Sequence, residues 1–457
     1  MDYSASYSGY PHFLPMKQIL EYLFSSKFLF GKLILMCIYV LTYDYMYENF
    51  IYKLFGYLGD VDYEPMGIMK KMVWLLLSTL PVVEYNGLKK ISSFFSLFIY
   101  LFVYIPFIHA MYVAYGIDTI QLGSYTLIMF VFILFYFKLG NGWSPIKDLE
   151  ICPQIPFRAI EITTILLTIM FVAAVRDRMQ FVNIFTNQSL LYELREQNSE
   201  SGVLGGIAYI QGWLFGAFYP YLLVVYLRQK HWIKSLFPLA GYMLLFMADM
   251  QKMTFVMPFA LMLLYYVIKI NEEKISNYLH SYIVVCLTIF SIIVYIFQED
   301  QLVFTLASFL LLRTVCVAGW LTQLYIHFFN ENPYTYYSHI NAVNFLTNSY
   351  PYNEVLGRAV ARGSQNANAN FFLTDGVAAA GLVGIFFIGL LFLGILILIN
   401  SISARYKRTD IFIIFMPTMA FFLNTSIFTT LLSNGLLVLI IIIACAESFY
   451  NKQANIS

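Results

Sequence analysis

Charged residues are scarce in this sequence. Of its 457 residues, 12% are charged and 60% are hydrophobic, and the mean hydropathy is +0.70. A soluble domain carries about 25% charged residues, so the composition excludes a water-soluble globular protein and predicts an all-α polytopic membrane protein. The net charge of +1 and the lack of a dense Lys/Arg block give no sign of a nucleic-acid partner, and none is expected.

Cysteine is also scarce, and its spacing carries no pattern. No C-x-x-C pair occurs among the five cysteines, which are Cys37, Cys152, Cys286, Cys316 and Cys445. This spacing excludes a disulfide framework and a zinc site. The chain shows no internal repeat at a fixed period and no appended soluble stretch, so we expect a single integral membrane domain over 1–457.

What the sequence has instead is long apolar runs. Each is long enough to cross, or nearly cross, the roughly 30 Å hydrocarbon core of a bilayer. They predict about twelve transmembrane helices, near 24–46, 72–86, 92–114, 120–138, 159–175, 204–227, 235–250, 254–270, 280–297, 377–399, 410–426 and 430–449.

Basic residues cluster in alternate connections between these runs. Lys and Arg are retained on the cytoplasmic side, so we expect these connections to be cytoplasmic, and both chain termini with them. The clustered residues are Lys89, Lys90, Lys138, Lys147, Arg158, Arg228, Lys230, Lys234, Lys269, Lys274, Arg405, Lys407 and Arg408.

One polar, loop-like stretch, 298–376, interrupts the apolar pattern. Short turns suffice to join helices, so a long and elaborate connection indicates a working surface. We expect a large external loop here, in which residues 302–330 are apolar enough to form a membrane-embedded or re-entrant helix pair.

Several cations fall on the external side of this predicted topology, where the positive-inside rule disfavours them. Arginine can contact phosphate through two hydrogen bonds and lysine acts on it as a point charge, so the set predicts a site for a phosphorylated ligand. The alternative is that they reach lipid headgroups or pair with nearby acids such as Asp177, Glu193 and Glu354. The cations are Arg176, Arg178, Lys252, Arg313, Arg358 and Arg362.

Two histidines in this stretch, His327 and His339, are candidate bases, because histidine accepts a proton near neutral pH. Each could equally be a hydrogen-bonded structural residue. Aromatic side chains here could stack on sugar rings, although an interfacial aromatic belt is also typical of such positions. They are Tyr325, Phe328, Phe329, Tyr334, Tyr336, Tyr337, Tyr350 and Tyr352.

An alternating run of Asn366, Asn368 and Asn370 offers amide groups to sugar hydroxyls or phosphate oxygens. It could instead be a turn before a helix that starts near Gly376, with Thr374 or Asp375 as N-cap.

Asp60 and Asp62, in the first external connection, could hold a divalent metal through oxygen ligands. Acidic external loops are common, however, so no metal site is predicted.

The chain resembles the Wzy-type O-antigen and capsular polysaccharide polymerases. The resemblance rests on many helices with one large external loop late in the chain, on a Gln251-Lys252 turn between paired helices, and on motifs within 250–385. These motifs are Arg313 followed by Tyr325, Phe328 and Phe329, then Ser338-His339, and then 366–376 leading into Gly381 and Gly384. The related O-antigen ligases end this loop with a His-Asn pair, where this chain has Ala369-Asn370.

The resemblance implies a GT-C-like, metal-independent glycosyltransferase in the bacterial inner membrane, without a cofactor, that serves O-antigen, lipopolysaccharide or capsule biosynthesis. Its substrate is an oligosaccharide linked to undecaprenyl pyrophosphate, and a chain-length regulator is an expected partner. Arg313, with His339 or Asp375 as the base, is the expected catalytic set. Arg176, Lys252, His327, Arg358, Arg362, Asn366, Asn368 and Asn370 are the expected substrate contacts.

Two other classes stay open. A flippase for lipid-linked oligosaccharides, or another transporter, would show repeat halves and charges at the membrane midplane. A scaffold or an acyltransferase is the other class, and for an acyltransferase the buried histidine of interest is His109.

Overall fold

The structure is a computed structural model that describes residues 16–56, 63–143, 146, 154–182, 205–362, 367 and 372–447. The described residues are almost all helical, and they hold no strand beyond one isolated bridge between Ile155 and Ala446. Eight helices in this part of the chain are long and apolar enough to cross a membrane, or nine if a bent pair is one span. The expected all-α class and the expected membrane character agree with this architecture.

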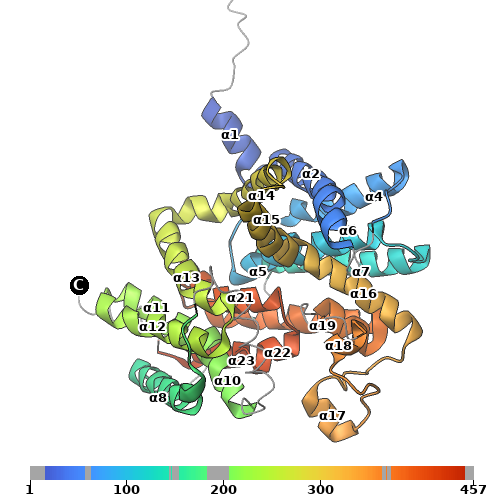
Figure 1. Ribbon diagram of the computed structural model, residues 1–457. Helices are drawn as coiled ribbons and strands as arrows, with labels where there is room; N and C mark the ends of the chain where they lie inside the picture. The colour runs from blue at the N-terminus through green and yellow to red at the C-terminus, as the bar shows by residue number, and fades with distance from the viewer. Residues whose placement is uncertain are drawn as a thin grey trace, which may run out of the picture.

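The first part of the chain contributes the helices on one side of Figure 1. Their bounds are α1 Met16–Phe24, α2 Leu29–Met46, the π-helical η1 Tyr47–Tyr52, α3 Lys53–Phe55, α4 Ile68–Thr79, η3 Leu80–Glu84, α5 Ile91–Ile99, the π-helical η4 Tyr100–Tyr104, α6 Ile105–Val113 and α7 Thr119–Gly140.

A second group of helices follows, which lies on the opposite side of the same view except that α14 returns to pack beside α2 (Figure 1). It comprises α8 Phe157–Val175, η5 Arg176–Arg178, α10 Gly205–Trp213, the π-helical η6 Leu214–Phe218, α11 Tyr219–Arg228, α12 Trp232–Asp249, α13 Lys252–Ile270 and α14 Glu272–Ile296.

The last part of the chain crosses back between these groups. It comprises α15 Gln301–Ala307, the π-helical η7 Ser308–Cys316, α16 Val317–Glu331, α17 Asn341–Thr347, α18 Leu356–Val360, α19 Phe372–Ser403, α20 Arg408–Ile414, α21 Met416–Phe422, α22 Ile427–Leu432 and α23 Leu436–Cys445.

A helix stands at each predicted apolar run, but several runs are not unbroken spans. The runs 410–426 and 430–449 are divided among the short helices α20 to α23. Pro417 begins α21 and the left-handed Gly435 precedes α23, so each interrupts helical geometry. The count of twelve therefore stays a prediction.

The stretch 298–376 is helical over most of its described length, and its position outside the membrane stays a prediction. Helix α16 and Val360 of α18 are buried against neighbours, whereas Phe345 and Leu346 of α17 are 88% and 82% exposed. The part Gln301–Leu312 and Val317–Glu331 is a bent pair with an angle of 56°. That arrangement matches the helix pair expected over 302–330.

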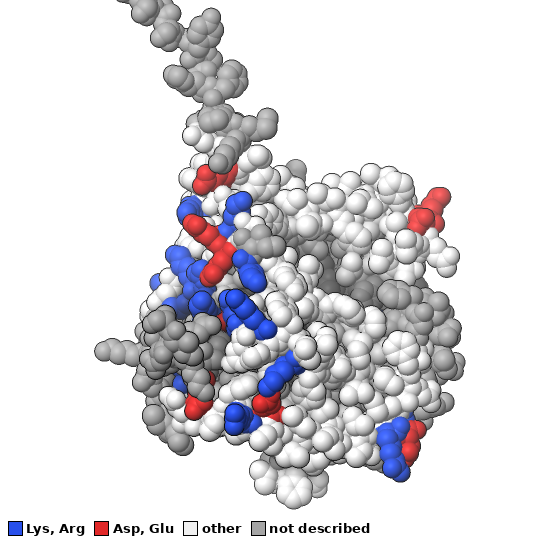
Figure 2. Space-filling model, turned by 90° about the vertical axis from the view of Figure 1, so that its left-hand side faces the viewer, with Lys and Arg blue, Asp and Glu red and all other residues white. Residues whose placement is uncertain are grey.

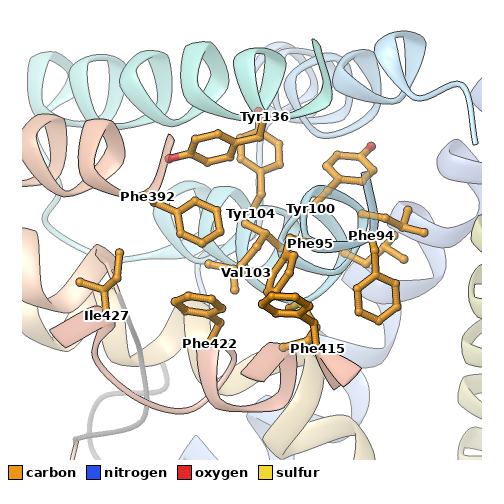
Figure 3. Packing of buried hydrophobic residues seen from close by; sticks show 14 of the residues in the cluster. Phe94, Phe95, Tyr100, Val103, Tyr104, Tyr136, Phe392, Phe415, Phe422 and Ile427 are labelled. Atoms are coloured by element: carbon orange, nitrogen blue, oxygen red, sulfur yellow. The ribbon is translucent and has the colours of Figure 1, made fainter. Parts of the chain in front are cut away.

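The core is built around the continuous span Ile91–Val113, which is the most deeply buried of the candidate spans. Figure 3 shows aromatic side chains from four elements meeting there. Phe95 packs edge-on against Phe422, and Phe392 contacts both Phe422 and Tyr136, at ring distances of 5.6, 5.1 and 5.1 Å. These contacts fix α19 and α21 against the centre of the bundle, and α19 carries Asp375.

Helix α19 is broken at Ala380 and Gly381, where Gly381 has φ +57°. A Cβ on Gly384 would stand 2.0 Å from the carbonyl oxygen of Gly376. In a straight helix these two residues would be about 12 Å apart, so the first part folds back on the second. The part after the break, 382–403, is about 33 Å long and is the portion that matches a bilayer.

The basic connections predicted to be cytoplasmic meet at one end of the bundle. Arg408 lies 3.9 Å from Glu272, and Lys27, Lys89 and Arg408 line one pocket. Figure 2 shows lysine and arginine side chains gathered over one part of this face, while much of the rest is uncharged. The structure thus collects these residues as the charge pattern predicts, while the side of the membrane stays a prediction.

Candidate active site

Two of the residues predicted as catalytic are brought together. His339 Nε2 lies 3.7 Å from Asp375 Oδ1, and both side chains are almost fully buried. His339 belongs to the turn between α16 and α17, whereas Asp375 belongs to the first part of α19. An imidazole next to a carboxylate in a buried setting is a pair that can hold and pass on a proton.

Thr335 fixes the imidazole of His339. The Thr335 hydroxyl donates to the carbonyl oxygen of Ala378 at 2.9 Å, and its oxygen lies 2.8 Å from His339 Nδ1. Because a hydroxyl has a single proton, Nδ1 must be the donor to Thr335. The other ring nitrogen, Nε2, has no hydrogen bond and is therefore the one left for Asp375 or a substrate.

The turn that carries His339 is conformationally unusual. Tyr336 and Tyr337 both adopt left-handed backbone conformations, with φ +45° and +66°. Such conformations are costly for aromatic residues and persist only where the surroundings impose them. Here the backbone N–H groups of Thr335 and Tyr336 donate to the carbonyl oxygens of Ala378 and Ala379, at 2.8 and 3.0 Å. The turn is thus tied to the end of the half-helix that carries Asp375.

Asp375 is held from the other side by α22. Its Oδ2 accepts a hydrogen bond from the backbone N–H of Ile427 at 3.1 Å, next to the Ser426 N-cap. Helix α19 begins at Phe372, so Thr374 and Asp375 lie within its first turn. The alternative that either residue is the N-cap of a helix starting near Gly376 was therefore wrong, because the helix begins before both of them.

Tyr337 adds a phenol to the same site. Its ring lies 6.2 Å from that of His339 and 5.8 Å from Phe428, and its hydroxyl is 3.5 Å from the carbonyl oxygen of Gly384. Burial and the nearby Asp375 carboxylate raise the pKa of the Tyr337 phenol. The phenol is therefore a proton donor at neutral pH rather than an anion.

The predicted cations have different surroundings. Arg358 and Arg362, in and just after α18, are exposed to solvent. They are joined to the site through backbone contacts, since Ala367 N–H donates to Gly357 and the Tyr325 hydroxyl donates to Ala367. Their guanidinium groups are thus available to a ligand that approaches from solvent.

Lys252 is half-buried at the start of α13, and the predicted tight turn precedes it, with Met250 left-handed at φ +54°. Asp249 organises this turn by accepting hydrogen bonds from Thr254 and Gln211, both at 2.7 Å. Gln211 lies on α10, whose neighbouring Gly212 packs directly on Ser433 after α22. The turn is therefore connected to the element that holds Asp375.

Arg176 pairs with a nearby acid, which is the alternative to phosphate binding given for the external cations. Its guanidinium lies 3.2 Å from Asp177, and the two side chains are 76% and 86% exposed. An ion pair so exposed contributes little, and each group remains hydrated. Arg178, two residues on, lies in the same short 3-10 turn.

Arg313 lies in η7, and its side chain is outside what the structure describes. Its backbone precedes α16, whereas His339 follows α16, a helix about 22 Å long. Arg313 and His339 therefore lie beyond opposite ends of α16.

His327, on α16, has a buried Nε2 without a hydrogen-bond partner. The aromatic residues around it pack on one another: Phe329 stacks on Tyr334 at 5.9 Å, and Phe328 lies 5.4 Å from Tyr352. Tyr336 differs in being 71% exposed. These rings form a packed cluster beside the site, and Tyr336 lies at its exposed edge against Tyr334.

Some predicted residues lie outside the described ranges. These are Asn366, Asn368 and Asn370, and also Asp60 and Asp62. Among the residues that are described, no group of three or more His, Cys, Asp or Glu side chains is arranged to hold a metal ion.

Sequence reasoning missed Thr335, Tyr337 and the contact of Asp375 with α22. Thr335 stands four residues before His339, a separation that by itself has no meaning outside a helix. The contact with α22 joins distant segments and leaves no local signal. Asp44 is different, because an aspartate within an otherwise apolar run is visible in the sequence as a buried charge.

Comparison of the chain with protein-family models, with curated proteins and with solved structures gives no match. The functional interpretation therefore depends on the residues and their geometry.

Proposed function

We propose that this protein is a membrane glycosyltransferase of the polysaccharide-polymerase type. It transfers a growing glycan from undecaprenyl pyrophosphate to a hydroxyl of a lipid-linked repeat unit. The observation that carries the proposal is the buried pair of His339 and Asp375, with one imidazole nitrogen fixed by Thr335 and the other left open.

In this reaction the acceptor hydroxyl oxygen forms a bond to the anomeric carbon of the donor glycan. The bond between that carbon and the pyrophosphate oxygen breaks, and undecaprenyl pyrophosphate leaves with the bonding electrons. The hydroxyl proton goes to Nε2 of His339, where the Asp375 carboxylate stabilises the imidazolium. The pair thus replaces the histidine that the ligases carry in their His-Asn motif.

Cations supply the second requirement, because a pyrophosphate leaving group develops negative charge as the bond breaks. Arg358 and Arg362 are exposed beside the site, and Lys252 lies in a turn linked to it through α10 and α22. Arg313 in η7 is the remaining cation of the proposed set, and it lies at the other end of α16 from His339. The long apolar helices provide the surface that holds the two polyprenyl chains.

Replacement of Arg313 by Ala tests the pyrophosphate role in cells. We expect long chains to disappear while single repeat units still reach the surface, because chain growth alone needs the transfer. A normal chain-length distribution with the variant protein present in the membrane would contradict the role of Arg313.

Metal independence is tested by the same assay in excess chelator, where we expect polymerisation to continue. Loss of activity that a divalent cation restores would instead assign a metal-binding role to Asp60 and Asp62.

A transporter is the second candidate, and one observation favours it. Asp44 and His109, each within a candidate span, form a hydrogen-bonded pair of ionisable groups inside the bundle. Charges within spans and broken helices such as α19 are typical of secondary transporters. Movement of lipid-linked oligosaccharide between leaflets by the purified protein, without chain growth, would support this candidate against the first.

A further inference from the structure

A second group of ionisable side chains lies inside the bundle, and the proposed transfer does not use it. Asp44 on α2 bonds to two partners from other helices: His109 Nε2 on α6 at 3.0 Å and Lys71 Nζ on α4 at 2.8 Å. The His109 side chain is fully buried and the Asp44 side chain is 6% exposed, whereas Lys71 is 46% exposed. Ionisable groups within spans are costly and usually functional.

One of the two imidazole nitrogens of His109 makes no hydrogen bond. With Nε2 bonded to Asp44, Nδ1 is buried and has no hydrogen-bond partner. Three aromatic rings surround it: Tyr47 at 4.6 Å, Tyr43 at 4.9 Å and Trp74 at 5.7 Å between centroids. Aromatic rings attract a cation through their electron-rich faces, so this enclosure suits an imidazolium as well as an imidazole.

A small cavity lies on the far side of two rings that contact this imidazole. Tyr43 and Tyr47, which contact His109, also line a cavity of about 20 Å³, enough for one water molecule. Ser291 of α14 and Cys316 of η7 line the same cavity, so it is partly polar. On the other side of the group, Lys71 reaches the surface of the bundle.

Two charged side chains act on His109, and each comes from a different helix. Asp44 from α2 and Lys71 from α4 are the charged groups that influence it, and Tyr43 and Tyr47 are the phenols against its ring. Helix α16 packs closely on α6 through Gly319, which faces the carbonyl oxygen of Pro106. With a neutral imidazole the charges of Asp44 and Lys71 cancel, and a proton on His109 adds one positive charge held by the carboxylate.

We propose that Asp44, His109 and Lys71 form a proton-binding site between α2, α4 and α6. A proton binds to Nδ1 of His109, the ring nitrogen that does not face Asp44, and no other bond is made or broken. Because the three residues come from three helices, the bound proton alters the charge that holds these helices together.

Trp74 offers a direct reporter, because a protonated imidazole in contact with an indole quenches its fluorescence. The probe is the full-length protein in nanodiscs with Trp143, Trp213, Trp232 and Trp320 replaced by Phe. We expect its emission to fall in a single step between pH 9 and pH 4, where histidine titrates. Absence of any step would overturn the proposal.

Substitutions test whether the fluorescence step is the titration of His109. His109→Gln should remove it, while His280→Gln, which replaces a buried histidine on α14, should leave it unchanged. Asp44→Asn should move the midpoint to lower pH and Lys71→Gln to higher pH, each by about one pH unit or more, as expected for a neighbouring charge. A step that survives in His109→Gln, or midpoints that do not move in these directions, would overturn the site. Near-UV circular dichroism establishes that each variant is folded.

Discussion

His339 and Asp375 face each other at 3.7 Å, although one lies in a turn and the other in a half-helix far along the chain. Their meeting depends on two further contacts: the backbone of Thr335 and Tyr336 bonds to Ala378 and Ala379, and Asp375 bonds to Ile427. Three segments thus converge to place one imidazole next to one carboxylate. This relationship is the structural basis for the functional proposal.

The first prediction concerns this pair. His339→Gln and Asp375→Asn should each lower the rate of chain growth by about 10²- to 10⁴-fold, the contribution typical of a general base. The rate is measured with lipid-linked repeat units in membranes that contain equal amounts of each variant. His231→Gln and Glu273→Gln, which alter exposed residues at the opposite end, are the matched controls. Equal rates in variants and controls would remove the pair from the reaction.

The second prediction concerns Thr335 as a positioning residue. Thr335→Val keeps the shape of the side chain but cannot accept a hydrogen bond from His339 Nδ1, whereas Thr335→Ser can. We expect the valine variant to lose roughly tenfold in rate, because one hydrogen bond contributes about 0.5–1.5 kcal/mol. The serine variant should recover most of it. A loss of the same size in both variants would show that packing, not the hydrogen bond, matters here.

The third prediction tests the folded-back arrangement of α19. A Cβ at Gly384 would stand 2.0 Å from the carbonyl oxygen of Gly376, whereas a Cβ at Gly394 in the same helix meets nothing within 4 Å. Gly384→Ala should therefore destabilise the protein by about 1–3 kcal/mol through overpacking. Gly394→Ala should not destabilise it. Thermal unfolding in detergent measures both, and similar unfolding temperatures for the two variants would contradict the fold-back.

The fourth prediction concerns topology. In a cysteine-free background, Asn353→Cys lies near the candidate site and Gln229→Cys at the basic end, and both positions are exposed. Because basic connections stay cytoplasmic, a membrane-impermeant maleimide should label position 353 in intact cells and position 229 only after permeabilisation. Labelling of position 229 alone in intact cells would reverse the predicted orientation. Labelling of both positions in intact cells would reject it.

Much of the fold could be predicted from the sequence, because apolar runs and charge patterns are local signals. Helices stand at each predicted run, and the basic connections meet at one end. The breaks could not be predicted in the same way. At Gly381 and Gly435 the backbone enters the left-handed region, whereas Gly319 and Gly389 stay within helices, so a glycine alone does not mark a break.

The candidate site was predictable in its residues but not in its arrangement. Histidine and aspartate in a polar stretch pointed to His339 and Asp375, whereas their contact depends on long-range packing that the chain does not display locally. The same is true of Asp44, His109 and Lys71, which only the packing of α2, α4 and α6 joins.

The most direct measurement uses the purified protein in nanodiscs with an undecaprenyl-pyrophosphate-linked repeat unit as the sole substrate. The proposal predicts a ladder of longer lipid-linked glycans and release of one undecaprenyl pyrophosphate for each bond formed, with neither product in Asp375→Asn. A substrate that remains a single repeat unit, with folded wild-type protein and lipid present, would contradict the proposed function.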